Sequence, residues 1–207
     1  MGDRKVDDVE ILIVGASGKL GSAVCRTLTQ RGHKVVTAGR SSGEIQVDLT
    51  DSASIADLYA AVGKVDAVAS AAGVTPFKPI RELTAEDYTA AYTSKALAQI
   101  ELVRQGLDRI AADGSFTLIT GILAREPIVT GAAASMAGGA VEAFVRAAAI
   151  EIAPQRINAI SPSVFTEALD AYGDYFPGFP AVPLADVAQA YVRSIEGKDT
   201  GKVYELG

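Results

Sequence analysis

The chain has 207 residues, 49% of them hydrophobic and 21% charged, a length that suits one α/β domain with a full core or two small domains. Its 19 basic and 25 acidic residues give a formal net charge of −6, and only 6% of its residues are aromatic. Because an acidic surface lacks the positive field that holds a phosphate backbone, and few rings are available for base stacking, we expect no nucleic-acid partner.

Apolar, β-branched runs alternate along the chain with longer, alanine-rich runs. In chain order this pattern predicts strand Ile11–Val14, helix Lys19–Gln30, strands Lys34–Ala38 and Ile45–Val47, helix Ser52–Ala61, strand Ala67–Ser70, helix Ala85–Ala111, strand Phe116–Thr120, helix Ala133–Ile152, strand Ile157–Ile160, helix Leu184–Ile195 and strand Val203–Leu206. Most strand runs are continuously apolar, which is typical of strands covered on both faces. The alternation predicts an α/β fold with a doubly wound parallel sheet of about seven strands and a ligand crevice at their carboxyl ends.

Two segments interrupt the alternation, but the chain shows no linker or repeat, so we predict a single domain over residues 1–207. The stretch between Ala38 and Ile45 has no room for a helix, which predicts a short loop and a stubby third strand. Residues 165–183 are rich in proline, glycine and aromatic residues. They form either a packed surface loop or a lid-like segment over a substrate, since loops of this length often carry function.

The run EILIVGASGKLG places Gly15, Gly18 and Gly21 directly after a buried strand and at the start of a helix. Small residues let the backbone turn tightly and approach a pyrophosphate, and the first N–H groups of the helix favour an anion. The alternative is a plain glycine-rich turn, but the order of strand, turn and helix favours dinucleotide binding.

The second predicted strand ends in TAGRSSG, where NAD-binding sites commonly carry an acidic residue for the ribose hydroxyls. Arg40, Ser41 and Ser42 stand here instead. A guanidinium and two hydroxyls suit a 2′-phosphate, which a carboxylate would repel, so we predict NADP(H). The alternative is a solvated surface arginine.

Further motifs follow in order along nearly the whole chain. Asp48–Thr50 (DLT) resembles the adenine-pocket motif of the short-chain dehydrogenase/reductase superfamily, and Ser70–Gly73 (SAAG) is similar to that family's NAAG turn. Arg156–Thr166 (RINAISPSVFT) resembles the stretch that borders the nicotinamide, with Ser163 in place of a glycine. The GxxGxxG spacing of the first turn, instead of GxxxGxG, marks an atypical branch. The resemblance implies a Rossmann-type fold and an oxidoreductase.

The cofactor that the resemblance implies is a nicotinamide dinucleotide, and Arg40 makes NADP(H) the predicted form. Its predicted contacts lie on the first turn, the second strand end and the three motifs. They are Gly15, Ser17, Gly18, Lys19, Leu20, Gly21, Arg40, Ser41, Ser42, Asp48, Leu49, Ala71, Ala72, Gly73, Thr120, Pro162 and Val164.

Chemistry in this family is usually carried by Asn, Ser, Tyr and Lys, with the Tyr moving the proton of the substrate oxygen. Aligning FVRAAAIEIA with the family pattern places the Tyr position on Ala134 and the Lys position on Gly138. The Ser position falls on Gly121 and the Asn position on Lys95. All four expected side chains are missing, so a reduction needs a replacement for an acid that typically contributes ~10²–10⁴-fold.

Lys95 is the first candidate, because its ammonium can stabilise oxyanion charge or donate a proton if desolvation lowers its pKa. The alternative is a solvated helix lysine paired with a carboxylate. Thr120 either orients a substrate oxygen or finishes its strand, and Ser135 either does the same or caps the helix beginning near Ala133. Tyr92 lies three residues before Lys95 and shares its helix face, but a core or interface role is the stronger expectation.

The aromatic residues of the lid-like segment are also open to two interpretations. Tyr172, Tyr175, Phe176 and Phe179 form either an apolar cap on a substrate or a hydrophobic plug in the core. His33 lies in the turn RGHK, at the sheet end opposite the crevice, and is assigned no catalysis.

Several features bear on partners and compartment. One histidine and the single Cys25, expected to be a small buried hydrophobe, cannot build a thiolate or histidine-rich zinc site, so we predict no metal. No apolar run reaches ~18 residues, and the charged start MGDRKVDDVE lacks the core of a secretory signal, so we expect a cytoplasmic protein without a membrane partner. The resemblance implies a homodimer or homotetramer through its long helices.

Two functional hypotheses remain, together with a third that no positive feature supports. The leading one is an NADP(H)-dependent oxidoreductase that reduces a small carbonyl or activated double bond with a non-standard catalytic group. The second is a catalytically silent NADP(H)-binding sensor or regulator, favoured by the missing catalytic side chains. The third is a non-redox lyase or isomerase.

Overall fold

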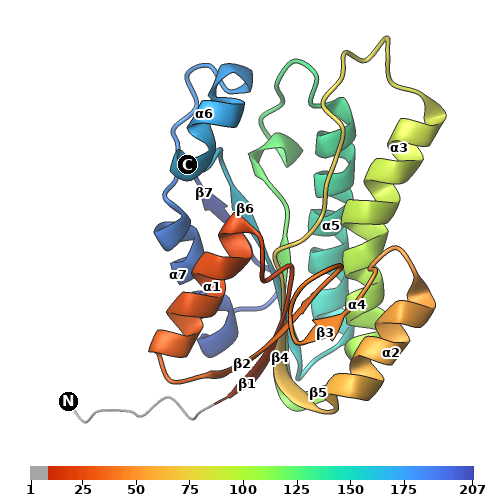
Figure 1. Ribbon diagram of the computed structural model, residues 1–207, viewed down its shortest axis with the longest axis vertical. Coiled ribbons are helices and arrows are strands. Elements are labelled where there is room, and N and C mark those ends of the chain that lie inside the picture. Colours follow the sequence, from red (N-terminus) through yellow and green to blue (C-terminus); the bar gives the residue numbers. More distant parts are fainter. Residues whose placement is uncertain (1–8) are drawn as a thin grey trace.

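The computed structural model describes residues 9–207, which form one seven-stranded sheet with helices on both faces (Figure 1). The expectation that the start of the chain carries no secretory signal falls mainly on residues 1–8, outside the described residues. Neighbouring strands are parallel, in the order β3-β2-β1-β4-β5-β6-β7, which confirms the predicted doubly wound sheet. The strands are β1 Glu10–Val14, β2 Lys34–Gly39, β3 Ile45–Gln46, β4 Val65–Ser70, β5 Ile110–Ile119, β6 Arg156–Pro162 and β7 Val203–Leu206.

The helices lie in two layers, α1 and α7 on one face of the sheet and α2, α4 and α5 on the other (Figure 1). Alternate residues of β1 show why both faces are apolar: Ile11 and Ile13 pack under α1 and α7, whereas Leu12 and Val14 pack under the other layer. The helices are α1 Lys19–Gln30, α2 Ser52–Val62, α3 Ala85–Ala91, α4 Ala98–Gly106, α5 Ala132–Glu151, α6 Leu169–Tyr172 and α7 Leu184–Glu196.

The predicted helix over 85–111 is wrong at its end and irregular in its middle. A π-helical turn, Tyr92–Leu97, joins α3 to α4. The helix ends at Gly106, and Ile110 instead begins β5, because it pairs with Val65 of β4 and is buried there. A register shift after that pair lets β5 run on to Ile119.

The short connection between β2 and β3 is confirmed, and β3 has only two residues. Gly43 has a φ of +105°, a backbone conformation that favours glycine, and the following Glu44 N–H donates to Thr37 O over 2.9 Å. This tight loop returns the chain beside β2 without a helix. The end of β2, where Arg40 begins the loop, therefore stays open to solvent.

Among the described helices, α5 alone is long and apolar enough to cross a membrane by length and composition. Its buried residues, among them Val141 and Val145, join the core under the sheet, which is how the central helix of an α/β fold is placed.

Gly139 offers a stability prediction in this helix. A Cβ built on Gly139 meets no atom within 4 Å, and its φ lies outside the left-handed region. We therefore expect Gly139→Ala to raise the free energy of unfolding by about 0.5–1 kcal/mol, because alanine loses less backbone entropy in a helix. Denaturant unfolding of the two proteins measures this difference, and a destabilised variant would contradict it.

Candidate active site

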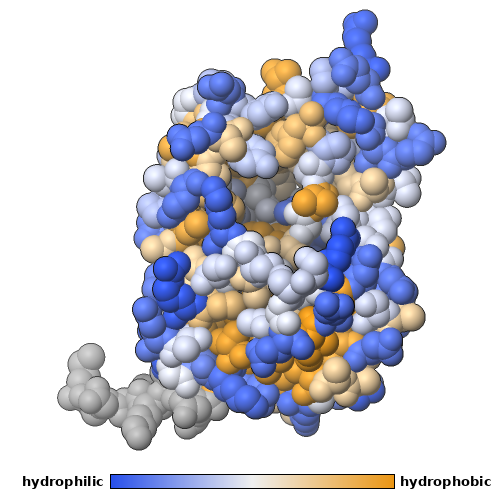
Figure 2. Space-filling model, in the orientation of Figure 1, coloured by the Kyte–Doolittle hydropathy of each residue, from blue (hydrophilic) through white to orange (hydrophobic). Residues whose placement is uncertain are grey.

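A cavity of about 560 Å³ opens at the carboxyl ends of the strands, where a doubly wound sheet places its ligand crevice. Figure 2 shows the hollow on this face of the molecule. Its walls come from the first turn, the loops after β4, β5 and β6, the π-helical turn, α5 and the lid-like segment. The predicted cofactor residues that line it are Gly18, Lys19, Leu20, Ala71, Ala72, Gly73, Thr120, Pro162 and Val164.

The glycine turn has the backbone geometry that a bound pyrophosphate needs. Gly15 has a φ of +86°, and a Cβ there would lie 2.9 Å from the carbonyl carbon of Ala71. A Cβ on Gly21 would lie 2.1 Å from Gly15 O, so α1 can pack on the turn only through a glycine. Gly18 is the N-cap of α1 without a side-chain cap, and the first turn of α1 carries no acidic residue. The residues present therefore fit a dinucleotide, whose phosphates the α1 N-terminus would hold.

The predicted 2′-phosphate residues lie farther along the same edge of the sheet, outside the cavity. The Arg40 side chain is 73% exposed, and its Nη2 lies 3.4 Å from Asp48 Oδ1. Ser41 and Ser42 are also exposed. Hydrogen bonds from the hydroxyl and N–H of Thr50, with a smaller contribution from Arg40, lower the pKa of Asp48. One loosely held guanidinium thus faces solvent beside an ionised carboxylate.

Two predicted cofactor residues flank these elements. Ser17 is exposed within the glycine turn. Leu49 packs against the core on the face of α2, α4 and α5, next to Asp48. Neither residue lines the cavity, and their contact with a dinucleotide stays a prediction.

The four positions that the resemblance assigns to catalysis line one cavity. Lys95, Gly121, Ala134 and Gly138 come from the π-helical turn, the loop after β5 and two turns of α5. Only Lys95 carries a functional side chain. A proton donor at the tyrosine position is absent because Ala134 ends at its Cβ.

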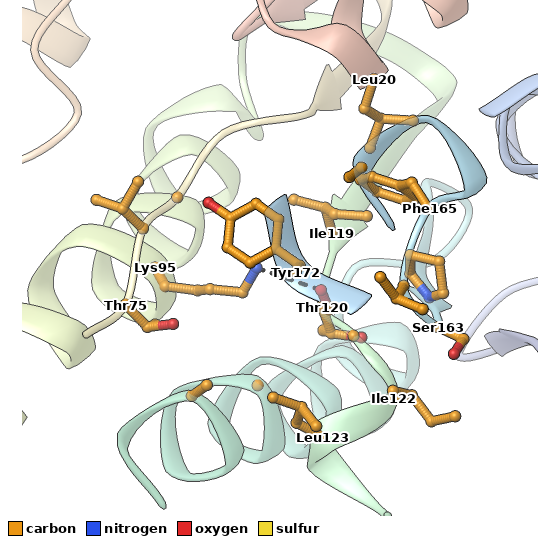
Figure 3. Close-up of a pocket in the computed structure, with 18 of the residues that line it drawn as sticks. Leu20, Thr75, Lys95, Ile119, Thr120, Ile122, Leu123, Ser163, Phe165 and Tyr172 are labelled. Carbon is orange, nitrogen blue, oxygen red and sulfur yellow. Dashed lines mark hydrogen bonds between the residues drawn. The ribbon is translucent and has the colours of Figure 1, made fainter. Parts of the chain in front are cut away.

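Lys95 reaches into the cavity and donates from Nζ to the Thr120 carbonyl oxygen over 3.2 Å (Figure 3). Burial lowers the pKa of its ammonium to about 8. Among the described residues, no carboxylate lies within ion-pairing distance of Nζ, so the alternative of a solvated, paired lysine does not apply. This ammonium can stabilise negative charge that develops on a substrate oxygen.

Gln99 fixes the π-helical turn that carries Lys95. Its buried amide donates from Nε2 to Lys95 O over 2.8 Å and to Ile119 O over 2.9 Å, while its Oε1 accepts from Ile119 N–H over 2.8 Å. Gln99 was not among the site residues predicted from the sequence. The one sequence feature that could have identified it is a glutamine within the apolar stripe of a helix. Its role matters because π-helical turns are frequent at functional sites.

Thr120 and Ser135, the other predicted catalytic residues, are placed differently. The Thr120 hydroxyl lies 3.0 Å from Glu142 Oε1 and 3.2 Å from Ile160 O, so its proton is already engaged within the protein. Ser135 does not line the cavity, and its buried Oγ has no hydrogen-bond partner among the described residues. It does not cap α5 either, because Gly131 is the N-cap. The structure brings Lys95 and Thr120 together and leaves Ser135 aside.

A buried polar network behind Thr120 was not predicted. Glu142 Oε1 accepts from Thr120 and, over 3.0 Å, from Ser161 Oγ. Arg125 Nη1 donates to Ser161 Oγ over 2.7 Å, and its Nε lies 3.5 Å from Glu205 Oε2. These residues are far apart in sequence and meet only where β5, β6 and α5 converge.

The lid-like segment forms one wall of the cavity and is joined to the body at its base. Thr166 N–H donates to Val182 O, and Val182 N–H donates to Val164 O. Lys19 Nζ donates to Glu167 O over 2.7 Å, which connects the segment to the glycine turn.

The aromatic side chains of this segment do not plug the core. Tyr172 and Tyr175 are 48% and 44% exposed, and their rings lie 6.5 and 5.8 Å from that of Phe77 across the cavity mouth. Tyr172 and Phe176 line the cavity, whereas Phe179 packs edge-on against Phe176. The geometry is that of an apolar cap.

Three other residues lie away from the cavity. Tyr92 is 40% exposed and does not line it. His33 lies at the amino end of β2, opposite the glycine turn, with Nε2 2.9 Å from Glu196 Oε1. Cys25 is half-buried in α1 rather than fully buried.

The chain is similar to a family model and to curated proteins that are named as reductases. A family model described as Enoyl-(Acyl carrier protein) reductase matches residues 15–183. Hydroxynaphthalene reductase arp2 of Aspergillus fumigatus is 28% identical over 176 residues, a match that covers 73% of this chain. The chain spans 64% of that relative, less than two thirds of its length. The Hydroxynaphthalene reductase-like protein Arp2 of Metarhizium robertsii is 26% identical over 204 residues, covering 85% of this chain and 76% of the relative.

Solved structures agree with the observed fold. The crystal structure of the protein lin1944 from Listeria innocua superposes with a TM-score of 0.93 and 48% sequence identity, covering 95% of this chain and 98% of that one. A small-chain dehydrogenase crystallised in complex with NADPH superposes with a TM-score of 0.86 over 96% of each chain, at 24% identity. At that identity the second likeness bears on the fold alone.

Proposed function

The chain belongs to the short-chain dehydrogenase/reductase superfamily, and from that premise we propose that it is an NADP(H)-dependent oxidoreductase that uses Lys95 in place of the usual tyrosine. The observation that carries the proposal is the set of four catalytic positions around one cavity, of which only Lys95 holds a functional group. The substrate class is a small carbonyl compound or activated double bond. The curated relatives, named as reductases, support this class.

In this proposal each part of the site has a distinct role in binding the dinucleotide or the substrate. When bound, the dinucleotide supplies two reducing electrons at its nicotinamide. The glycine turn and α1 would hold its phosphates, and Ala71, Ala72 and Pro162, which line the same cavity, would form part of the wall along it. Lys95 places a positive charge where the substrate oxygen becomes negative, and the lid-like segment keeps water from that oxygen.

The preference for NADP(H) over NAD(H) is tested by Arg40→Ala. We expect the Kd of NADPH to rise about 10–100-fold and that of NADH to change less than about threefold, because the charge-assisted bonds of one guanidinium to a phosphate contribute roughly 1.5–3 kcal/mol. Calorimetric titration of each cofactor gives both constants. The matched control is Arg26→Ala, which removes an exposed arginine of α1. Equal weakening of both cofactors would contradict the preference.

The reductase proposal is tested by NADPH oxidation across a panel of carbonyl compounds and enones. Turnover of at least one acceptor is expected. The second candidate, a silent NADP(H)-binding regulator, is favoured by the absent side chains at Gly121, Ala134 and Gly138. It requires tight NADPH binding with no oxidation across the whole panel. The expected homodimer or homotetramer and the cytoplasmic location stay predictions.

A further inference from the structure

The charges that line the cavity have one sign. Within the described part of the chain, its charged lining residues are Lys19 and Lys95, and no aspartate or glutamate joins them. Lys19 lies at the glycine turn with its ammonium on Glu167 O. Lys95 is therefore the cation available to a ligand in the interior.

Lys95 has donor capacity that the described protein does not use. An ammonium has three N–H donors, and one of them reaches Thr120 O. The nearby carboxylate of Glu142 lies behind Thr120, where its Oε1 is occupied by two hydroxyls. A partly buried cation without an anionic partner is unfavourable, and an anionic oxygen in the cavity would correct this.

The remaining walls suit a flat apolar ring. Phe77, Tyr172 and Phe176 line the mouth. Ile119, Ile122 and Leu123 are among the aliphatic residues of the interior (Figure 3). The absence of side chains beyond Cβ at Gly121, Ala134 and Gly138 leaves open the space that Ser, Tyr and Lys would fill. Apolar walls with one polar group are the usual design of a site that orients a small molecule.

We propose that this cavity binds a planar aromatic ligand through one anionic oxygen, a phenolate, held by the ammonium of Lys95. The inference rests on the proposed function and narrows its substrate to quinone-type acceptors. A quinone that takes up two electrons and one proton as a hydride from the reduced dinucleotide becomes the hydroquinone monoanion. The second proton comes from water. Because the ring spreads the negative charge, the product does not need the proton donor that Ala134 lacks.

The titratable groups that share the cavity with Lys95 or lie behind its wall are the ammonium of Lys19 from α1, the hydroxyl of Tyr172 from α6 and, behind Thr120, the carboxylate of Glu142 from α5. The pH window of binding follows from the Lys95 ammonium itself. Below about pH 8 the Lys95 ammonium carries its charge and can hold a phenolate. Binding of the anion should therefore weaken as the pH rises above that value.

The test uses 4-nitrophenol, which titrates near neutral pH and absorbs visible light strongly only as the phenolate. The full-length protein is saturated with NADP⁺, which cannot reduce the probe, and the probe is titrated at several pH values. We expect the phenolate to bind about tenfold more tightly than the neutral phenol, for which the methyl ether 4-nitroanisole is the stand-in that cannot ionise. The apparent pKa of the bound phenol then falls by about one pH unit, because each tenfold preference shifts the titration by that amount.

Variants assign the effect to Lys95. In Lys95→Met, which keeps an unbranched chain without the charge, the preference for the phenolate should disappear. In Lys198→Met, which removes an exposed lysine outside the cavity, it should persist. NADP⁺ affinity measured in each variant shows that the fold and the dinucleotide site are intact.

The outcomes separate this inference from the proposed function. Equal binding of 4-nitrophenol and 4-nitroanisole, binding of the neutral phenol as tightly as the phenolate, no binding of either compound, or unchanged binding by Lys95→Met would overturn the phenolate site even if NADP⁺ binds. Lys95-dependent phenolate binding by a protein without affinity for NADP(H) would uphold the site and overturn the proposed function.

Discussion

Replacing Lys95 with methionine is expected to lower kcat/KM for NADPH-dependent reduction by about 10²-fold or more. A preorganised charge at the developing oxyanion contributes ~10²–10³-fold, and no other described side chain at the four catalytic positions supplies one. Stopped-flow or steady-state NADPH oxidation with an acceptor from the panel measures the change. The Kd of NADPH should stay within about threefold, since the variant leaves the glycine turn untouched.

Two controls make this prediction specific. Lys198→Met, on the exposed surface, should retain the parent rate. Lys95→Arg keeps the positive charge and should recover part of the rate, because guanidinium differs from ammonium in shape and not in sign. A Lys95→Met enzyme with the parent kcat/KM would remove Lys95 from the mechanism.

The same residue predicts the pH dependence of the reaction. Burial lowers the pKa of Lys95 to about 8, so the cationic form predominates below that value and is lost as the pH rises through it. The rate should be high near pH 6–7 and fall above about pH 8. In Lys95→Met this fall should vanish. A parent enzyme whose rate rises through pH 8 would instead point to the neutral amine as a base.

The second large effect is expected at the glycine turn. Gly21→Ala should abolish measurable dinucleotide binding or weaken it at least ~100-fold, and should lower the free energy of unfolding by roughly 1–3 kcal/mol. The added Cβ would stand 2.1 Å from Gly15 O and 2.8 Å from Ala16 Cα, both backbone atoms that cannot rotate away. Helix α1 must therefore move off the turn, and the backbone N–H groups at its N-terminus no longer point at the phosphates.

The matched control is the Gly139→Ala variant described above, where the same methyl group meets open space. It should bind NADPH like the parent. Calorimetric titration for binding and denaturant unfolding for stability distinguish the two variants. Parent-like dinucleotide affinity in Gly21→Ala would show that the turn does not hold the phosphates.

Much of the fold was predictable because its signals are local. Continuous apolar runs such as Ile11–Val14 identify strands covered on both faces, and the glycine spacing at 15, 18 and 21 reflects backbone requirements that only glycine meets. The error at residues 107–111 has an equally clear origin. Leu107 and Ala111 suit a helix locally, but the pairing of Ile110 with Val65 is a contact between distant residues that overrides this preference.

The candidate site likewise has features that the sequence predicts and features that only the tertiary structure shows. The absence of the catalytic Asn, Ser, Tyr and Lys, the Gly-rich turn and the place of Arg40 at the end of the second strand were all predictable from the amino-acid sequence, because residue identity at a motif position needs no geometry. Only the tertiary structure shows that Lys95 enters the cavity with no carboxylate beside it among the described residues. It also shows that Gln99 hydrogen-bonds the π-helical turn to β5 and that the Thr120 hydroxyl donates to Glu142. Such facts depend on which side chains the sheet order and the helix packing bring together, and residues tens of positions apart carry no local pattern that records their contact.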